Sequence, residues 1–471
     1  MKLKNKILLS SLILIGMVVL SGCGCKQTNP KKYTMNLEIW GLFDDGDAYN
    51  EIFEAYKKVN PNIGQINYKK LNSDTYKRDL IDAMASGQGP DIFLLHNNWV
   101  PNMASKIYPA PRDVLNEQKF RQNFVDVAAQ DFILDGLVGA VPLSIDSLGL
   151  FYNKDLFNEA GITSPPKNWD EFMEDVRKLT KFDAQGQITQ AGAAMGTAAN
   201  INRATDILNL LMLQTGTEMV DVANRKATFD KYVNQGEITS SPGESAWNFY
   251  TQFATQGASS IPYTWNSRQH YSVDAFSEGT LGMMFNYSWQ IPVLASKSPK
   301  LNYGIVSVPQ FPNSQQINFA NYWAYTVAKN RTPDMTGTAP AVAASVTNDM
   351  RATEAWMLLT FMTTKPEQTI ATTASVVGTT QTMNSDFDPA ISYLIKTNKP
   401  AARRDLIEQQ KSDPLLGAFA TGNLIARDWF QIDSDSIEVL FLQSIDRINR
   451  GQTSVKDAIK SAATAVTQMM N

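Results

Sequence analysis

The sequence has very little histidine and cysteine, with two residues of each among 471. A zinc site of the usual kind draws its ligands from these two residue types, and a Ser-His-Asp triad would have to use His96 or His270. The motifs H-E-x-x-H, G-x-S-x-G and G-x-x-x-x-G-K are missing as well. The sequence therefore predicts no metal, no cofactor and no enzyme of these classes. A glycosidase needs only two carboxylates, so Asp44, Asp45 and Asp146 keep that alternative open.

An excess of charge of one sign is also lacking. Lys and Arg number 42, Asp and Glu number 46, and the formal net charge is −4. No run of five or more basic residues occurs, so a nucleic-acid partner is not expected. With 43% hydrophobic and 19% charged residues, the composition is that of an ordinary globular protein, and the length fits two or three domains.

Long apolar runs are limited to one, from Ile7 to Leu20, and three Lys precede it within the first six residues. As a helix its 14 residues would span about 21 Å, short of the roughly 30 Å hydrocarbon core of a bilayer. This pattern predicts a signal peptide over residues 1–22, and therefore export. The ending Leu20-Ser21-Gly22-Cys23 resembles the lipobox of bacterial lipoproteins. The resemblance implies that Cys23 is acylated and anchors the protein at the outer face of the cytoplasmic membrane. The alternative is an ordinary signal peptide with a chance Cys.

Residues 23–34 are mostly polar and predict a tether of low structure. If Cys23 is acylated, Cys25 has no partner in the chain, so no intramolecular disulfide is expected.

From residue 35 onward, apolar residues follow the periods of strands and helices in turn. Met35 to Trp40 alternates as a strand does, residues 52–59 have helical spacing, and Asp91 to Leu95 is a short candidate for a buried strand. Such alternation predicts an α/β fold with a parallel sheet covered by helices. The last 35 residues predict two helices separated by Gly451. The stretch from Thr332 to Ala344, rich in Thr, Pro, Gly and Ala, predicts a loop insertion.

Several motifs then point to one family. They are Gly89-Pro90-Asp91-Ile92, the segment Gly136 to Trp169 with Val141-Pro142-Leu143 and Phe151-Tyr152-Asn153-Lys154, Phe276-x-x-Gly279-x-x-x-Met283, Tyr303-Gly304-x-x-x-x-Pro309 and Gly451-Gln452-x-Ser454-Val455. Together they resemble the extracellular solute-binding proteins of ABC importers, and above all the sugar-binding group that includes maltose-binding protein. The resemblance implies an α/β fold of two lobes, with three hinge crossings, a helical C-terminus and a ligand held in the cleft between the lobes.

A protein of this kind carries out no chemistry. It binds a sugar or an oligosaccharide as its lobes close, and it delivers the solute to permease subunits in the membrane. We expect a monomer. The same fold could instead bind a polyamine, which needs several acids beside aromatic rings, or a phosphorylated polyol, which needs Arg or a helix N-terminus. A surface glycosidase and a receptor or adhesin without a permease are the alternatives from other classes.

The resemblance also divides the chain. By analogy the crossings lie near Val141 to Ser147, Phe319 to Tyr325 and Val376 to Met383. The N-terminal lobe then comprises 35–143 plus 322–378, and the C-terminal lobe 148–318 plus 384–471. Two departures from the family pattern are the insertion at 332–344 and Gly378-Thr379-Thr380-Gln381, where many members have a Leu-Pro pair.

Aromatic candidates for the site come first, because sugars offer flat apolar faces. Trp169, Trp247 and Trp356 lie on apolar helix faces and are assigned to the core. The other six Trp residues follow strands or begin loops, where the ligands of α/β sheets bind, and they are predicted to contact the ligand: Trp40, Trp99, Trp265, Trp289, Trp323 and Trp429. By the resemblance, Trp289 matches a stacking position and Trp429 a position near the cleft.

Polar candidates supply the hydrogen bonds that sugar hydroxyls need. They are Asp44, Asp45, Asn97, Asn98, Asp146, Asn286 and Arg427. For Asp44 and Asp45 the alternative is to cap the following helix. For Asp146, in the first crossing, it is to fix the hinge.

Overall fold

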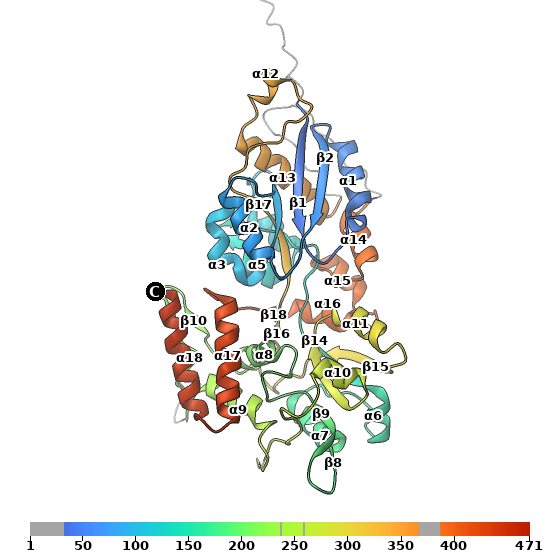
Figure 1. The fold of residues 1–471 in the computed structure, drawn as a ribbon, viewed down its shortest axis with the longest axis vertical. Coiled ribbons are helices and arrows are strands. Elements are labelled where there is room, and N and C mark those ends of the chain that lie inside the picture. The colour runs from blue at the N-terminus through green and yellow to red at the C-terminus, as the bar shows by residue number, and fades with distance from the viewer. Residues whose placement is uncertain (1–32, 236–237, 258–259, 367–386) are drawn as a thin grey trace, which may run out of the picture.

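The computed structural model describes residues 33–235, 238–257, 260–366 and 387–471. Two clusters of buried apolar side chains divide these residues into two lobes, stacked one above the other in Figure 1. The first cluster includes residues from Tyr33 to Ile145, the second residues from Leu148 to Phe319, and each also draws on later segments. The predicted α/β fold of two lobes is confirmed.

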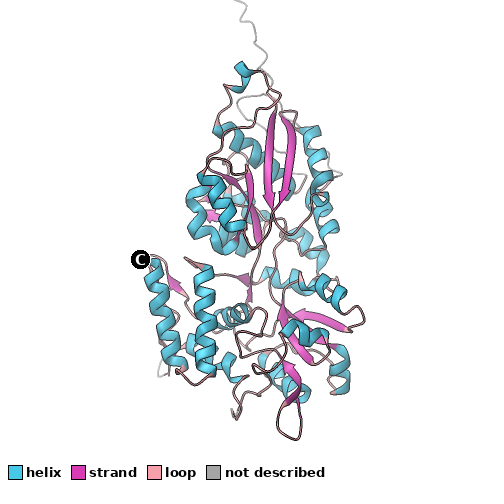
Figure 2. Ribbon diagram, viewed as in Figure 1, coloured by secondary structure: helices cyan, strands magenta, loops and turns pink. Residues whose placement is uncertain are grey.

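The N-terminal lobe is built on a five-stranded sheet of order β2-β1-β3-β17-β4. Its strands are β1 (Met35–Gly41), β2 (Ile63–Lys70), β3 (Ile92–His96), β4 (Ile107–Tyr108) and β17 (Trp323–Ala328). β1, β2 and β3 run parallel, whereas β17 returns antiparallel to β3. The carboxyl ends of the parallel strands point toward the second lobe, as Figure 2 shows.

Helices cover both faces of this sheet. They are α1 (Asp47–Val59), α2 (Tyr76–Ala85), α3 (Val100–Met103), α4 (Glu117–Asn123), α5 (Asp126–Phe132), α12 (Pro340–Ala343), α13 (Asn348–Thr363), α14 (Pro389–Thr397) and α15 (Arg404–Gln410). A short hairpin, β5 (Ile133–Leu134) and β6 (Leu137–Val138), follows α5. The predicted helical spacing after residue 52 is explained by α1, which buries Ile52, Phe53 and Tyr56.

The C-terminal lobe has a sheet of order β15-β7-β14-β9-β8. Its strands are β7 (Gly149–Asn153), β8 (Lys181–Phe182), β9 (Ile188–Ala193), β14 (Leu281–Asn286) and β15 (Tyr303–Ser307). Its helices are α6 (Lys154–Glu159), α7 (Trp169–Leu179), α8 (Ala204–Gln214), α9 (Pro242–Gln252), α10 (Ser272–Ser277), α11 (Gln290–Lys297), α16 (Gly417–Leu424), α17 (Ser434–Asn449) and α18 (Val455–Met470). Two hairpins, β10 (Val220–Asp221) with β11 (Lys226–Ala227) and β12 (Val233–Gln235) with β13 (Ile238–Ser240), complete it.

Local signals in the sequence account for several boundaries. Asn168 caps α7, because its side chain accepts a hydrogen bond from the backbone N–H of Glu171 at 2.9 Å. Gly451 separates α17 from α18 with a φ of 66°, a conformation that side chains other than glycine adopt at a cost. Trp169, Trp247 and Trp356 are fully buried, as predicted for core residues.

Two crossing segments run side by side between the lobes. Val141 and Tyr325 exchange both backbone hydrogen bonds, at 2.8 and 2.9 Å, and the backbone N–H of Asn321 donates to the carbonyl of Asp146 at 3.0 Å. A third segment of the chain also lies here, because β18 (Ala426–Arg427) pairs in parallel with β16 (Asn318–Phe319). Small rotations of these few residues are sufficient to move one lobe against the other.

The third predicted crossing, Val376 to Met383, lies outside the described residues. The helices described before and after it, α13 and α14, both belong to the core of the N-terminal lobe. The expected C-terminal lobe of 384–471 therefore begins too early. Tyr393 and Leu394 of α14 pack in that core because α14 lies against α1, and the chain enters the other core only at Leu416.

The first described residues, Tyr33 and Thr34, also differ from the prediction of a tether through residue 34. The Tyr33 side chain is buried, and its hydroxyl donates to Glu354 Oε1 at 2.6 Å. The backbone N–H of Thr34 donates to Thr338 Oγ1 at 3.0 Å. The insertion at 332–344, which contains α12, thus fastens the beginning of β1.

Asp91, in one of the motifs, has a structural role. Its carboxylate accepts from the backbone N–H of Glu38 at 2.8 Å and lies 3.3 Å from Arg351 and 3.4 Å from Arg331. Burial raises the pKa of Asp91, and the two guanidinium groups oppose that shift. This buried cluster joins α13 to the sheet.

Candidate functional site

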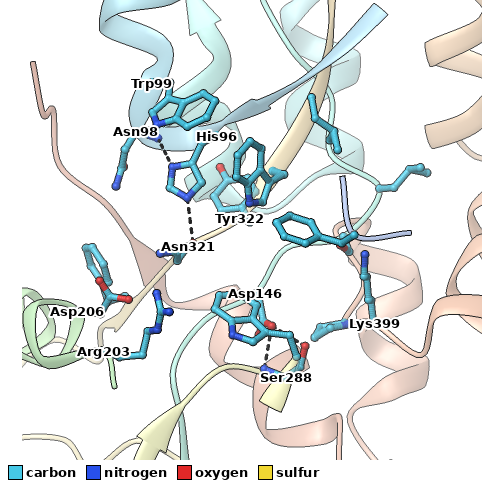
Figure 3. A pocket seen from close by; sticks show the side chains of 18 of the residues that line it. His96, Asn98, Trp99, Asp146, Arg203, Asp206, Ser288, Asn321, Tyr322 and Lys399 are labelled. Carbon is cyan, nitrogen blue, oxygen red and sulfur yellow. Dashed lines mark hydrogen bonds between the residues drawn. The ribbon is translucent and has the colours of Figure 1, made fainter. Parts of the chain in front are cut away.

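A cavity of about 900 Å³ lies between the two lobes, and side chains from both lobes and from the crossing segments line it (Figure 3). It opens at the carboxyl ends of β1 and β3, where ligands of α/β sheets bind. The lining residues that carry the argument below are Phe43, Asp44, Tyr49, His96, Asn98, Trp99, Asp146, Arg203, Asp206, Ser288, Trp289, Asn321, Trp323, Tyr393, Lys399, Gln431, Asp435 and Glu438.

The wall from the N-terminal lobe is aromatic. Trp323 packs edge-on against Trp99, with ring centroids 5.0 Å apart, and against Phe43 at 5.7 Å. Phe43 is 53% exposed and has a φ of 40°, so its backbone is strained while its ring faces solvent. Strained backbone at a ligand cavity commonly marks a functional position. We call Phe43, Trp99 and Trp323 the aromatic wall.

His96 completes this wall as a neutral imidazole. Its ring lies 4.9 Å from that of Trp323. The backbone N–H of Asn98 donates to Nδ1 at 3.3 Å, so Nε2 carries the proton and donates to Asn321 Oδ1 at 3.0 Å. Burial lowers the pKa of His96 to about 4. Both ring nitrogens are occupied, so His96 orders its neighbours rather than acting as a base.

Asp44 is neutralised at one end of the cavity. The ammonium group of Lys399 lies 2.6 and 2.7 Å from its two oxygens, and the Tyr393 hydroxyl donates to Oδ2 at 2.7 Å. The Tyr49 hydroxyl reaches the same oxygen at 3.2 Å. Since Asp44 precedes α1 and Lys399 follows α14, this ion pair fastens α14 to the rim of the cavity.

Asp146 fixes the hinge from inside the cavity. The backbone N–H groups of Ser147 and Ser288 donate to its carboxylate at 3.0 and 2.9 Å, and Ser288 Oγ donates to it as well. Burial nevertheless raises the pKa of Asp146 to about 7. The side chain therefore connects the first crossing segment to the end of β14, which is the hinge role considered for it.

The wall from the C-terminal lobe combines charged side chains with apolar ones, and Trp289 is its exposed aromatic ring. Trp289 is 38% exposed and stacks on Tyr287, with centroids 4.4 Å apart. The Arg203 guanidinium lies over the Trp289 ring at 5.7 Å. Arg203 itself has a φ of 69°, and its Nε donates to Asn202 Oδ1 at 2.9 Å. Trp289 thus lines the cavity with a partly exposed ring that Tyr287 and Arg203 hold in place.

Three carboxylates from the C-terminal lobe, Asp206, Asp435 and Glu438, also line the cavity. We call them the acidic wall. Burial raises the pKa of Asp206, and the charge of Arg203 opposes that shift. Asp435 pairs with Lys77 of α2 at 2.8 Å, so this ion pair joins the two lobes at the edge of the cleft. Asn102 Nδ2 donates to the Ile432 carbonyl across the same edge.

Of the predicted site residues, six line the cavity: Asp44, Asn98, Trp99, Asp146, Trp289 and Trp323. The other seven do not. Asp45 is exposed and pairs with Lys70 at 2.9 Å, and it makes no cap with α1. Trp40 is buried within β1, and its Nε1 donates to Glu38 Oε1 at 2.6 Å.

Three further candidates serve the packing of the C-terminal lobe. Trp265 is fully buried, and its Nε1 donates to Asn200 at 3.1 Å. Trp429 is buried against Phe441 and donates to Asn209 at 3.2 Å. Asn286 Nδ2 donates to Asn202 at 3.2 Å, one layer behind the cavity. The sequence around these three residues does not show whether their side chains are buried or line a cavity.

The last two lie where the lobes join. Arg427 Nη1 donates to the carbonyl of Ala426 at 3.0 Å. Asn97 Nδ2 donates to Asp428 Oδ2 at 2.6 Å and lies 3.5 Å from Asp131 Oδ2. Burial raises the pKa of Asp131 to about 7 and that of Asp428 well above its usual value. Asn97 thus bridges two buried carboxyl groups behind the cavity.

The sequence did not point to several lining residues. Arg203 immediately precedes α8, Asp206 and Glu438 lie on helices with no motif, and Lys399 follows α14. Phe43 lies directly before the predicted Asp44 but was not itself proposed. Only the left-handed backbone of Phe43 and Arg203 marks them, and that signal exists in the structure alone.

Two properties bear on the class of protein. Within the described ranges, no helix is long and apolar enough to cross a bilayer. Nor do those ranges contain a group of three or more His, Cys, Asp and Glu side chains arranged to hold a metal ion.

Comparison with known proteins decides the family. The model of the family described as bacterial extracellular solute-binding protein matches residues 40–369, well over half of the chain. The chain belongs to this family. Its members are exported, non-enzymatic binding proteins, so the reading as a binder rather than a glycosidase is confirmed.

Individual members of the family are distant. A Brucella abortus protein named only as a binding protein is 24% identical over 268 residues, which are 57% of this chain and 61% of that protein. The multiple sugar-binding protein of Streptococcus mutans is 22% identical, over 66% of this chain and 70% of its own. In structure, the cyclic α-maltosyl-1,6-maltose binding protein of Arthrobacter globiformis has a TM-score of 0.70 at 18% identity, covering 93% of this chain and 99% of that one. At this identity the likeness concerns the fold.

Proposed function

We propose that this protein captures a sugar or an oligosaccharide between its lobes and delivers it to the permease of an ABC importer, while Cys23 holds it to the membrane. The observation that carries the proposal is the pairing of Trp289 from one lobe with the aromatic wall from the other around a single cavity. Flat rings on both sides suit the apolar faces of a sugar, and the carboxylates and amides between them suit its hydroxyls.

The volume of the cavity is compatible with this ligand class. Small-molecule sites enclose roughly 300–1,000 Å³, and this cavity holds about 900 Å³. The names of a relative and of a structural neighbour, one a multiple sugar-binding protein and the other a cyclic α-maltosyl-1,6-maltose binding protein, agree with a saccharide ligand.

Closure of the lobes would enclose the solute. The crossing segments 141–147 and 319–325 are few and paired, as a hinge requires, and the Lys77–Asp435 and Asn102–Ile432 contacts join the rims of the two lobes. A permease that recognises the joined rims would distinguish the loaded form from the empty one.

The ligand class is tested by thermal unfolding and calorimetric titration against a panel of mono- and oligosaccharides, with spermidine and a polyol phosphate included. A ligand that binds only the native state stabilises the protein, by about 2.7 kcal/mol at a concentration a hundredfold above Kd. The melting temperature rises as a result. Stabilisation by a saccharide is the expected result. Stabilisation by spermidine or the phosphate alone would refute the sugar proposal.

Anchoring is tested on the full precursor expressed in a bacterium. The natural sequence should partition with membranes, and Cys23→Ser should be released, with Cys25→Ser as the matched control that stays bound. Two acyl chains give stable attachment where one gives marginal binding. Free release of the unmodified protein would refute the anchor while leaving the ligand proposal intact.

A further inference from the structure

The charges around the cavity do not balance. Five carboxylates line it, those of Asp44, Asp146, Asp206, Asp435 and Glu438, against two cations, Arg203 and Lys399. Three of the five are already compensated. Lys399 pairs with Asp44, Lys77 pairs with Asp435, and three donors hold the carboxylate of Asp146.

The remaining two carboxylates, Asp206 and Glu438, share Arg203. Within the part of the chain that the structure describes, no Arg203–carboxylate ion pair as short as 4 Å is found. Tyr287 and Asn321 stand close enough to lower the pKa of Asp206, but no hydrogen bond of ordinary geometry reaches its Oδ2. Partial desolvation and then the charge of Asp206 raise the pKa of Glu438. Two carboxyl groups thus face one guanidinium at this end of the cavity.

A second observation at the same end indicates a polar ligand. Gln431 lines the cavity, is only 5% exposed, and leaves Nε2 without a hydrogen-bond partner among the described residues. Its amide lowers the pKa of the neighbouring Asp428, although the contact does not meet ordinary hydrogen-bond geometry. A buried donor of this kind costs free energy unless an acceptor meets it. A ligand oxygen would supply that acceptor.

We infer that the solute is a saccharide that bears one protonated amino group, and that this ammonium group lies against Asp206 and Glu438. The inference rests on the proposed function and narrows its ligand. One ammonium balances the remaining charge, a ring or hydroxyl oxygen satisfies Gln431, and the apolar face of the ring meets Trp289. A neutral sugar leaves the charge uncompensated, and a linear polyamine offers neither the acceptor nor the ring face.

The test is calorimetric titration of the full chain with matched pairs: glucosamine with glucose, galactosamine with galactose, and chitobiose with cellobiose. In the pairs that bind, the amine should bind at least about tenfold more tightly, as charged hydrogen bonds allow. N-acetylglucosamine and diacetylchitobiose, which lack the charge, should bind like the neutral sugars.

Variants assign the preference to these two residues. Asp206→Asn and Glu438→Gln should bring the ratio of amine to neutral affinity close to one, and this ratio is the readout whatever the variants do to the affinity for the neutral sugar. Asp446→Asn is the matched control, because Asp446 is exposed on the same helix as Glu438 and pairs with Arg450 at 3.1 Å. Unfolding of the apo variants separates loss of fold from loss of preference. Because the carboxyl of Asp206 is destabilised by burial, Asp206→Asn should leave the apo protein at least as stable.

Each other outcome overturns the inference in a distinct way. Neutral sugars that bind as tightly as their amines, or neutral oligosaccharides that bind when no amine does, would refute the amino group and leave the proposed sugar function standing. Binding of spermidine with no saccharide would refute both. An unchanged preference in Asp206→Asn and Glu438→Gln would refute the assignment to these residues.

Discussion

The two walls of the cavity are built on different principles. The aromatic wall of Phe43, Trp99 and Trp323 belongs to one mutually packed cluster, in which the neighbouring His96 imidazole is held neutral and Lys77 lies 4.9 Å from the Trp99 ring. The acidic wall of Asp206, Asp435 and Glu438 carries charges whose partners are distant, shared or on the other lobe. The aromatic wall offers apolar contact area, and the acidic wall offers directional polar interactions.

This difference shows how binding and closure can be divided between the lobes. Rings that pack on one another keep their positions whether or not a ligand is present, so the N-terminal lobe is suited to receive the solute first. Charges without direct partners gain most from a ligand or from the opposite lobe, so the C-terminal lobe is suited to respond to it. Changes on the aromatic wall should therefore affect the apo fold, and changes on the other wall should affect mainly the complex.

The largest effect is expected for Trp323→Ala. Trp323 contacts Phe43, Trp99, His96 and Tyr76, so its loss should destabilise the apo protein by about 2–4 kcal/mol and abolish measurable ligand binding. Denaturant unfolding and titration report the two effects. An apo protein of unchanged stability would contradict the description of this wall as one packed cluster.

Trp289→Ala should separate binding from stability. Removal of one stacking face should lower the affinity for the identified ligand roughly 5- to 150-fold, by analogy with base stacking worth about 1–3 kcal/mol. The apo stability should change by less than about 1 kcal/mol, because the ring is partly exposed. Phe182→Ala, at an exposed ring on the remote strand β8, is the control that should change neither. A loss of apo stability of about 3–5 kcal/mol would instead assign Trp289 to the core.

Asp131 accepts a hydrogen bond from Tyr322, which lines the cavity. Asp131→Asn should change the pH dependence of stability. In the folded protein burial raises the pKa of Asp131 to about 7, from an ordinary value of about 3.9. Between these values the folded state holds a proton that the unfolded state has lost, so stability falls as the pH rises toward 7. The variant should gain on the order of 1–2 kcal/mol over the natural protein at pH 8 and much less at pH 5. Denaturant curves at the two pH values measure this, and a pH-independent difference would exclude the role of the buried proton.

The smallest effect is expected at the rim, for Lys77→Met. The Lys77–Asp435 pair is partly exposed, and such pairs contribute about 0.2–1 kcal/mol, so ligand affinity should fall by a factor of roughly 1.4 to 5. In 1 M salt, where the Debye length is about 3 Å, the difference should nearly vanish. Lys57→Met, which removes a pair within α1, is the control that should leave affinity unchanged. A loss of affinity that persists in high salt would mean that Lys77 acts through its packing over Trp99 rather than through its charge.

The sequence predicted the frame of the molecule better than its details. Strand and helix periods were sufficient for β1, α1 and β3, because α1 buries one face and the two short strands are buried almost throughout, all in a single lobe. The placement of α14 could not be read in this way. Its apolar face has the same pattern whichever lobe it covers, and only its contact with α1 decides the matter.

The site divided in a similar way. Trp99, Trp289 and Trp323 could be proposed because a Trp just beyond a strand is either buried or functional, and the structure places these three at the cavity. Trp265 and Trp429 fit the same rule and are buried. Arg203 and Asp206 belong to the start of α8, whose sequence is that of a buried helix, so nothing local distinguishes them.

The position of Tyr33 has a consequence for how the protein would meet its permease. The described residues begin at the end of β1 that points away from the cavity, where the Tyr33 hydroxyl donates to Glu354. Cys23, the proposed lipid site, lies ten residues before Tyr33, so the distance between these two residues cannot exceed about 36 Å. The search for a permease would then be confined to a thin layer along the membrane, where a short tether gives an effective concentration in the millimolar range. An affinity between carrier and permease that is too weak to detect in free solution would suffice there.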